Sequence, residues 1–470
     1  MITVDYFEIL VIIYTLLFIA SMAIFNMKVL SPSIIFTASF TVMVYLALFT
    51  KDIMGFVVSK KTFEVLTLGG CLFVATEFCV MFYFNILRHR KKVIIRPVTD
   101  RKPLYIRKST LDLFFILINF SFALVIVSII QSTGGSVGNR MEIYKNMMLY
   151  ETGTVRYRFL LNQLFKINTA VSYVCAYIGI YNFSMCGENI KKQFKYFAIV
   201  CNYIIYSLFS QGARQPAIEI IVFAVLMYFV WNLKKADRHR MIKQICKMII
   251  IAPIAAVIFT KTAVMVGRRN INRKVITYMS TYFCGGLYAF NLYIDEPARN
   301  TIWGQASFAD VYQFLSKLGI VPKSYVASYH SFELYGNTVT IFGRWYKDFG
   351  TIGVCIMTIL VSAIFSILFY RYIYPTDRNQ TNHLSKMIYG KLVMALVWAG
   401  YDDRIRALFS MANIMYLMFI AITYRVFVVE HLRVKIRGAE NCFIESSSDR
   451  TFLFPLFKVS SRDLIYEVMV

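Results

Sequence analysis

The fold is decided by residues 87–108, LRHRKKVIIRPVTDRKPLYIRK, which separate two long apolar runs at 63–86 and 111–130. The stretch carries nine Lys and Arg residues and one acid, Asp100. An α-helix needs about 20 apolar residues to cross a bilayer. Strongly basic segments beside such helices stay on the cytoplasmic side. The stretch therefore predicts two transmembrane helices joined by a cytoplasmic loop.

Similar apolar runs recur along the whole chain, of which 58% is hydrophobic, with a mean hydropathy of +0.57. Because the runs are continuous and do not alternate, they predict helices and not the strands of a barrel. The sequence predicts an all-α polytopic membrane protein with about eleven transmembrane helices. The runs fall at 6–25, 33–50, 63–86, 111–130, 167–186, 196–210, 216–233, 247–266, 350–372, 387–400 and 407–428.

Alternation of the runs places the other strongly basic segments, at 187–195 and 234–247, on the cytoplasmic side as well. The N-terminus is then outside and the C-terminus is cytoplasmic. This organisation predicts a transmembrane domain over 1–428 and a cytoplasmic tail over 429–470. Two long outer loops are expected at 131–166 and 267–349, and long loops on one face of a helical scaffold commonly carry function.

Charge and cysteine content exclude several classes of protein. The net charge of +25 fits basic cytoplasmic loops and contact with anionic membrane lipids, and no separate basic face predicts a nucleic-acid partner. The nine cysteines include no C-x-x-C pair, so neither a disulfide framework nor a zinc site is expected. HExxH, P-loop and GxSxG motifs are also missing from the sequence. We expect no metal and no cofactor.

The predicted outer loops are unexpectedly rich in arginine. A guanidinium fork can grip two phosphate oxygens, whereas a lysine acts as a point charge. The bias therefore predicts a site for a diphosphate or a carboxylate at the outer membrane surface. The outer arginines are Arg140, Arg156, Arg158, Arg214, Arg268, Arg269, Arg273, Arg299, Arg344, Arg404 and Arg406.

Two short segments supply most of the predicted phosphate-binding arginines. Arg214 lies in SQGARQP (210–216), a tight turn between two apolar runs, where it could instead form a structural pair with Glu219. Arg268, Arg269 and Arg273 lie in VGRRNINRK (266–274), which would also fit an exposed basic helix end.

Candidates for acid–base chemistry lie at the end of the larger outer loop. The stretch NTVTIFGRWYKDFGTIG (337–353) contains Arg344, Tyr346 and Asp348, and His330 precedes it. Histidine titrates near neutral pH and suits a general base. Alternatives are that Asp348 caps a helix and that His330 packs against aromatic rings. Arg404 lies in YDDRIR (401–406), which could equally be a self-neutralising turn.

Three segments together resemble the oligosaccharide repeat-unit polymerases (O-antigen polymerases) of bacterial envelopes. They are NTVTIFGRWYKDFGTIG (337–353), FSQGARQPAIEIIVFAV (209–225) and ITYMSTYFCGGLYAFNLYI (276–294). The resemblance covers roughly residues 110–425, and the predicted number of helices fits the family's layout. It also implies a GT-C-like fold in the bacterial cytoplasmic membrane.

The resemblance implies a glycosyltransferase acting at the outer face of that membrane. Such an enzyme transfers a glycan from undecaprenyl diphosphate to the terminal sugar of an incoming lipid-linked repeat unit. Implied partners are the undecaprenyl-diphosphate-linked oligosaccharide and a chain-length regulator protein. Arg344, His330 and Asp348 are the expected catalytic residues, and the expected diphosphate ligands are Arg214, Arg268, Arg269, Arg273, Arg404 and Tyr346.

Two other functions stay open from the sequence. An O-antigen ligase, which moves a finished glycan onto a lipid A core, would also need outer arginines and a histidine in the large loop. A flippase for lipid-linked oligosaccharides is an alternative of another class. The long outer loop and the lack of internal repeats disfavour the flippase.

Overall fold

The computed structural model describes residues 5–90, 103–134, 140–150, 153–210, 213–232, 257, 260–262, 275–294, 302–325, 338–374 and 382–429. These residues form helices and connecting turns, with no strand among them. The first half contains α1 (Phe7–Ile24), α2 (Pro32–Leu48), α3 (Lys51–Met54), α4 (Lys60–Arg90), α5 (Lys108–Thr133), α6 (Arg140–Tyr150), α7 (Arg158–Met185), α8 (Ile190–Ser210) and α9 (Gln215–Asn232). The second half contains α11 (Val275–Tyr293), α12 (Ala309–Lys317), η1 (Lys323–Tyr325), α13 (Ile341–Leu368), η2 (Phe369–Ile373), α14 (His383–Leu392), α15 (Met394–Val397), α16 (Ile405–Leu408), α17 (Met411–Thr423) and η3 (Tyr424–Val429).

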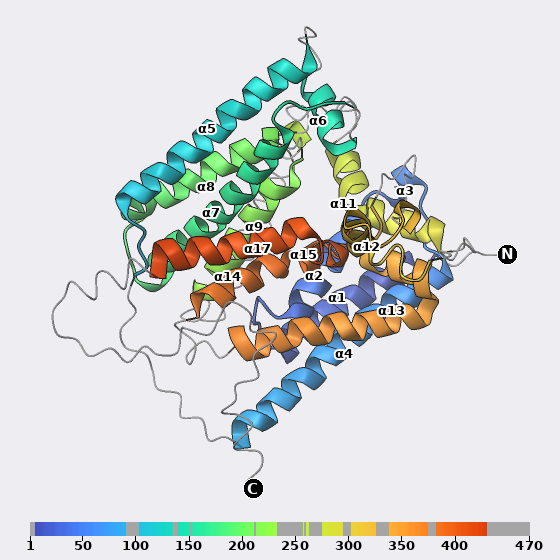
Figure 1. Cartoon of the computed structure of the whole chain (residues 1–470). Helices are drawn as coiled ribbons and strands as arrows, with labels where there is room; N and C mark the ends of the chain where they lie inside the picture. The colour runs from blue at the N-terminus through green and yellow to red at the C-terminus, as the bar shows by residue number, and fades with distance from the viewer. Residues whose placement is uncertain are drawn as a thin grey trace.

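The helices pack as two neighbouring groups (Figure 1). In one group α13 lies along α4, α4 packs with α1 and α2, and α13 also contacts α2. The other group contains α5, α7, α8, α9 and α17. Helices α14 and α15 join the groups, because α14 contacts α9 and α17 while α15 contacts α2. Helices α14 and α15 therefore lie between the two groups.

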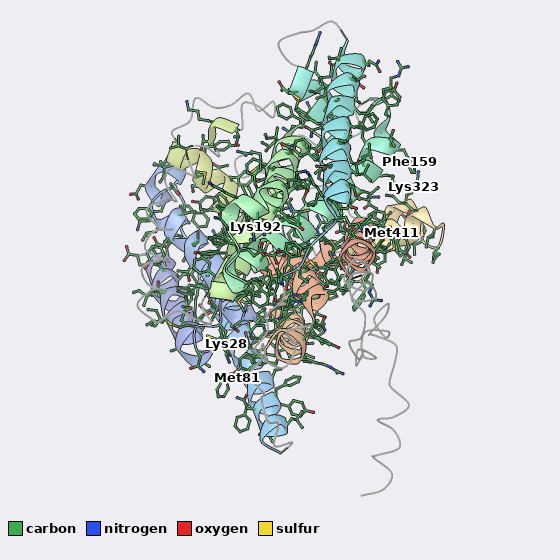
Figure 2. The ribbon with its side chains drawn as sticks, turned by 90° about the vertical axis from the view of Figure 1, so that its left-hand side faces the viewer. Lys28, Met81, Phe159, Lys192, Lys323 and Met411 are labelled. Atoms are coloured by element: carbon green, nitrogen blue, oxygen red, sulfur yellow. The ribbon has the colours of Figure 1, made fainter. Side chains whose placement is uncertain are left out.

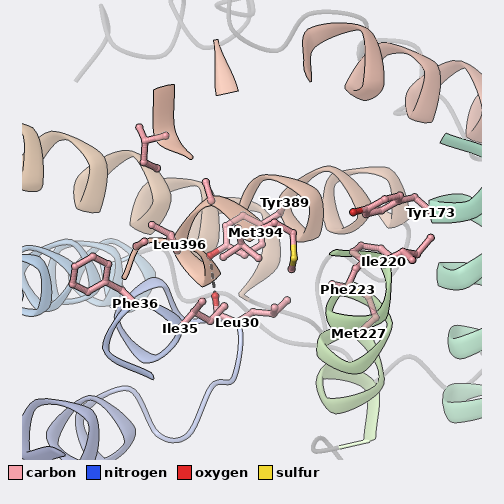
Figure 3. Packing of buried hydrophobic residues seen from close by; sticks show 14 of the residues in the cluster. Leu30, Ile35, Phe36, Tyr173, Ile220, Phe223, Met227, Tyr389, Met394 and Leu396 are labelled. Atoms are coloured by element: carbon pink, nitrogen blue, oxygen red, sulfur yellow. Dashed lines mark hydrogen bonds between the residues drawn. The ribbon is translucent and has the colours of Figure 1, made fainter. Parts of the chain in front are cut away.

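Close packing at this junction is visible in Figure 3. Tyr389 of α14 donates a hydrogen bond over 2.8 Å to the carbonyl oxygen of Leu30, just before α2. On the other side of the junction, the rings of Tyr173 and Phe223 lie 4.7 Å apart between α7 and α9. A side chain at Gly390 would meet Phe223 and Met227 at 2.7 Å, so α14 approaches α9 closely only because this residue is glycine.

Several helices are suited to a membrane by length and composition. Five among the described residues are long and apolar enough to cross one: Phe7–Ile24, Lys60–Leu87, Lys108–Thr133, Ile341–Ile373 and Met411–Val428. Pro32–Leu48 and Gln215–Trp231 are shorter apolar helices. Large apolar side chains cover the outside of the bundle, including Phe159 with 78% exposure and Met411 with 49% (Figure 2). The chain is a helical membrane protein, as its composition predicts.

Two predicted runs differ in the structure. The run predicted at 387–400 is divided between α14 and α15. The run predicted at 350–372 belongs to a helix that already begins at Ile341 and bends at Gly350, where φ is +65° and ψ −161°. Most of the run predicted at 247–266 and all of the tail predicted at 429–470, apart from Val429, lie outside the described residues.

Hydrogen bonds between distant segments join helix ends that the alternation of inner and outer loops predicts on the same side of the membrane. At the predicted inner side, Leu104 and Asn182 exchange hydrogen bonds of 2.7 and 2.8 Å. At the predicted outer side, Ser59 N donates to Asn291 Oδ1 over 2.9 Å. These pairings agree with the predicted alternation of loops, and the orientation in the membrane stays a prediction from the basic segments.

A buried acid between α2 and α4 is fully engaged by its surroundings. Glu77 of α4 accepts hydrogen bonds from Ser31 Oγ at 2.7 Å, from Ser33 N at 2.5 Å and from Tyr370 Oη at 3.3 Å. The backbone N–H of Ser33 lies in the first turn of α2, where no intrahelical acceptor exists. Glu77 therefore satisfies a helix end inside the bundle.

Candidate functional site

Three distant segments meet through their backbones close to the start of α13. Thr340 N donates to Gly286 O over 3.3 Å, Ile341 N to Ala399 O over 3.1 Å, and Asp403 N to Val339 O over 3.2 Å. A Cβ atom at Gly286 would lie 2.2 Å from the carbonyl oxygen of Tyr401. The glycine therefore lets α11 approach the turn that follows α15. This junction brings three sequence motifs together: 276–294, 337–353 and 401–406.

The turn at 401–406 is rich in charged groups that are shielded from solvent. Arg404 Nε lies 3.0 Å from Asp402 Oδ2, and Arg406 Nη1 lies 3.4 Å from Asp310 Oδ2 of α12. Asp402 and Asp403 are both buried. The expected self-neutralising turn is confirmed in part, because Arg404 pairs with an acid of the turn while Arg406 reaches an acid of the large outer loop.

Asp403 sits at the centre of these charges. Its Oδ1 accepts a hydrogen bond of 3.0 Å from Ile405 N, whereas neither Oδ2 of Asp403 nor Oδ1 of Asp402 has a hydrogen-bond partner among the described residues. Burial raises the pKa of Asp403 to about 6, although the neighbouring charges of Arg344 and Arg406 oppose the rise. Part of this turn's negative charge can therefore be neutralised near neutral pH.

Arg344 of α13 is half-buried beside the same turn. It interacts electrostatically with Arg406, Asp402, Asp403 and Asp310. Within the described part of the chain it forms no ion pair within 4.0 Å, and its Nε has no acceptor. A guanidinium with unused donors in a partly enclosed place is suited to bind an anion.

Arg214 approaches the turn through aromatic side chains. It is buried, donates a hydrogen bond of 2.6 Å to Tyr278 Oη, and lies 5.0 Å from the ring centroid of Tyr282. The ring of Tyr282 stacks at 5.0 Å on that of Tyr401. The aromatic segment at 276–294 thus links Arg214 to the turn at 401–406.

The alternative pairing of Arg214 with Glu219 is wrong. Glu219 instead pairs with Lys391 at 2.5 Å and accepts a hydrogen bond of 2.6 Å from Gln215. Because Gln215 and Glu219 are four residues apart on α9, they share a helix face, while Arg214 precedes the helix. Arg214 instead reaches α11, where it donates to Tyr278 Oη.

Asp348 and Tyr346, two predicted site residues of α13, contact different segments of the chain. Asp348 accepts hydrogen bonds from Ser307 N at 2.6 Å and Ala306 N at 3.2 Å, both just before α12. This is a capping role, but for another segment and not for its own helix. Tyr346 packs at 6.1 Å on the ring of Phe290 and lies 5.3 Å from Lys61 Nζ. Both residues hold the outer segments together.

Four other predicted site residues belong to parts of the chain that the structure does not describe. His330, Arg268, Arg269 and Arg273 lie outside the described residues. Of the predicted diphosphate ligands and catalytic residues, Arg214, Arg344 and Arg404 gather around the turn at 401–406.

A cavity of about 200 Å³ adjoins this turn. Its wall combines the Glu219–Lys391 ion pair and Arg404 with a set of aromatic rings. The lining comprises Phe165, Thr169, Tyr173, Tyr203, Gln215, Pro216, Glu219, Lys391, Met394, Ala395, Trp398, Arg404, Ala407, Leu408, Ser410, Ala412, Asn413 and Tyr416. Arg404 thus belongs both to the charged turn and to the cavity wall.

Sequence reasoning left several members of this site unassigned. Asp403 and Arg406 lie in YDDRIR (401–406), where they count only as one acid and one arginine of an outer loop, and Lys391 lies in the apolar run predicted at 387–400. A charge in such a run is the signal that could find Lys391, because a charge inside a bundle needs a partner or a cavity. The structure supplies both, with Glu219 as the partner.

Comparison with protein-family models, with curated proteins and with solved structures gave no match.

Proposed function

We propose that this protein is a repeat-unit polymerase acting on a glycan carried by undecaprenyl diphosphate. The observation that carries the proposal is the gathering of Arg214, Arg344, Arg404 and Arg406 around one turn, from three separate parts of the chain. In the described part of the chain, Asp402, Asp403 and Asp310 lie among these arginines. Guanidinium groups gathered from separate segments suit a diphosphate.

The arginines would act on the leaving group of the transfer. A hydroxyl oxygen of the acceptor sugar attacks the anomeric carbon of the donor glycan, and the bond from that carbon to the diphosphate oxygen breaks. The diphosphate leaves with the bonding electrons and gains negative charge, which Arg344 and its neighbours stabilise. The hydroxyl proton passes to a base, for which His330 is the candidate from the sequence.

The proposal includes the outer face of a bacterial cytoplasmic membrane as its location. Support comes from the basic segments, which predict that the turn at 401–406 faces away from the cytoplasm.

The test is polymerisation in proteoliposomes by the purified full-length protein, supplied with purified undecaprenyl-diphosphate-linked repeat unit. We expect the wild type to form a ladder of longer glycans on a gel. Arg344→Ala and Arg214→Ala should reduce the rate by about 100-fold, the usual cost of losing one donor to a developing oxyanion. Arg371→Ala is the matched control, because Arg371 lies at the opposite end of the same α13–η2 helix and is exposed.

Three results would overturn the proposal. Normal ladders from both arginine variants would remove the arginines from the chemistry. Movement of lipid-linked sugar across the bilayer without lengthening would indicate a flippase. Transfer to a lipid A core without prior lengthening would indicate a ligase.

A further inference from the structure

The cavity beside the charged turn contains polar groups without partners. Tyr173 is 1% exposed and Trp398 4% exposed, and both line the cavity. Among the described residues, no group forms a hydrogen bond with Tyr173 Oη or Trp398 Nε1. A buried hydroxyl or indole N–H normally has a partner, because leaving one unpaired is costly. Figure 3 shows the hydroxyl of Tyr173 directed toward the helices that carry Tyr389 and Met394.

An ion pair lies in the same wall. Lys391 Nζ and Glu219 Oε2 are 2.5 Å apart, and their side chains are only 10% and 12% exposed. The ammonium group also lies 5.1 Å from the ring centroid of Tyr173 and 5.8 Å from that of Tyr416. Because a buried ion pair gives little net stability, its place in a cavity wall favours a role toward a polar ligand.

Size and lining together define the chemistry of this ligand. A volume of about 200 Å³ is below the usual range of about 300–1,000 Å³ for drug-sized ligands, so the cavity suits a single ring. Aromatic faces from Tyr173, Tyr416 and Trp398 suit the apolar face of a sugar ring. The unpaired donors and the charged pair suit its hydroxyl groups. Glu219 supplies acceptor oxygens, which match the donor hydroxyl groups of a sugar.

We propose that this cavity binds one sugar residue of the glycan, next to the diphosphate held by the arginines. The inference rests on the proposed function and adds the substrate contact that positions the sugar. Tyr173 donates or accepts through its hydroxyl, Trp398 donates through its indole N–H, and Lys391 and Glu219 present one charge each. Arg404 connects the two parts, since it lines the cavity and belongs to the charged turn.

Binding is tested first, without turnover. The probe is the repeat-unit oligosaccharide released from its lipid by mild acid, added to the wild type in detergent while tryptophan fluorescence is recorded. We expect a saturable change that disappears in Trp398→Phe. Undecaprenyl phosphate should give no such change. A change with undecaprenyl phosphate and none with the oligosaccharide would overturn the sugar assignment.

Kinetics test the same site independently. Tyr173→Phe keeps the ring and removes the unpaired hydroxyl, so KM for the lipid-linked repeat unit should rise about tenfold while kcat stays within about twofold. Tyr206→Phe is the matched control, because Tyr206 is equally buried but lies outside the cavity.

The two proposals fail in different ways. If the wild type polymerises and Tyr173→Phe leaves KM unchanged, the sugar site is wrong and the polymerase stands. If the oligosaccharide changes the Trp398 signal but the wild type forms no polymer, the sugar site stands and the polymerase is wrong.

Discussion

Two buried acidic sites in this protein differ in how completely their hydrogen bonds are made. Glu77, between α2 and α4, accepts from Ser31, Ser33 and Tyr370. In the turn at 401–406, one carboxylate oxygen of Asp402 and one of Asp403 lack a partner among the described residues. A buried carboxylate whose hydrogen bonds are all made stabilises a fold, whereas unpaired acceptors and donors can form hydrogen bonds with a ligand. The comparison separates a structural polar cluster from a candidate site.

The largest expected effect on stability belongs to Glu77. Glu77→Ala leaves three buried donors without their acceptor, so the free energy of unfolding should fall by about 3 kcal/mol. The folded fraction should polymerise at the normal rate. The measurement is thermal unfolding in detergent alongside the gel assay, with Glu64→Ala as the control because Glu64 is an exposed residue of the same helix. A Glu77 variant with normal stability and no activity would show that Glu77 belongs to a functional site and is not a structural residue.

A second effect on stability should appear in its pH dependence, at Asp403. Its pKa in the folded protein is about 6, raised by burial from 3.8, so the folded state binds the proton more tightly than the unfolded state. This contribution to stability is fully present below about pH 4 and is lost as pH rises toward about 6 and above, with a slope of up to about 1.4 kcal/mol per pH unit.

Asp403→Asn removes the titrating group but keeps an oxygen that can accept from Ile405 N. The melting temperature should therefore fall less steeply between pH 4 and pH 7 in the variant than in the wild type. Parallel curves for the two proteins would show that Asp403 is not the buried titrating group.

The smallest effect is expected at Asp348, which sequence reasoning placed among the catalytic residues. Its two oxygens hold the N–H groups of Ala306 and Ser307. Asp348→Asn keeps one acceptor, so polymerisation should fall no more than about threefold and the melting temperature should fall by a few degrees. A loss of 100-fold at normal stability would instead restore Asp348 as a catalytic group.

Much of the candidate site could be predicted, but its partners could not. The arginine bias of the predicted outer loops pointed to Arg214, Arg344 and Arg404, and the structure places these three around one turn. The alternative pairing of Arg214 with Glu219 is wrong, because Glu219 lies on α9 whereas Arg214 precedes that helix and donates to Tyr278 of α11. Lys391, which pairs with Glu219, is 172 residues away, and no local pattern gives that contact.

Local features of the sequence are enough to predict that this chain is helical and suited to a membrane, and which helix ends lie on the same side. Apolar runs and basic loops act locally, through the cost of unpaired backbone groups and charges in lipid. The meeting of the motifs at 276–294, 337–353 and 401–406, through Gly286 and three backbone hydrogen bonds, depends on long-range packing that no local pattern predicts. The same packing decides that a cavity with unpaired donors adjoins them, because cavity shape depends on how side chains from five or more helices pack.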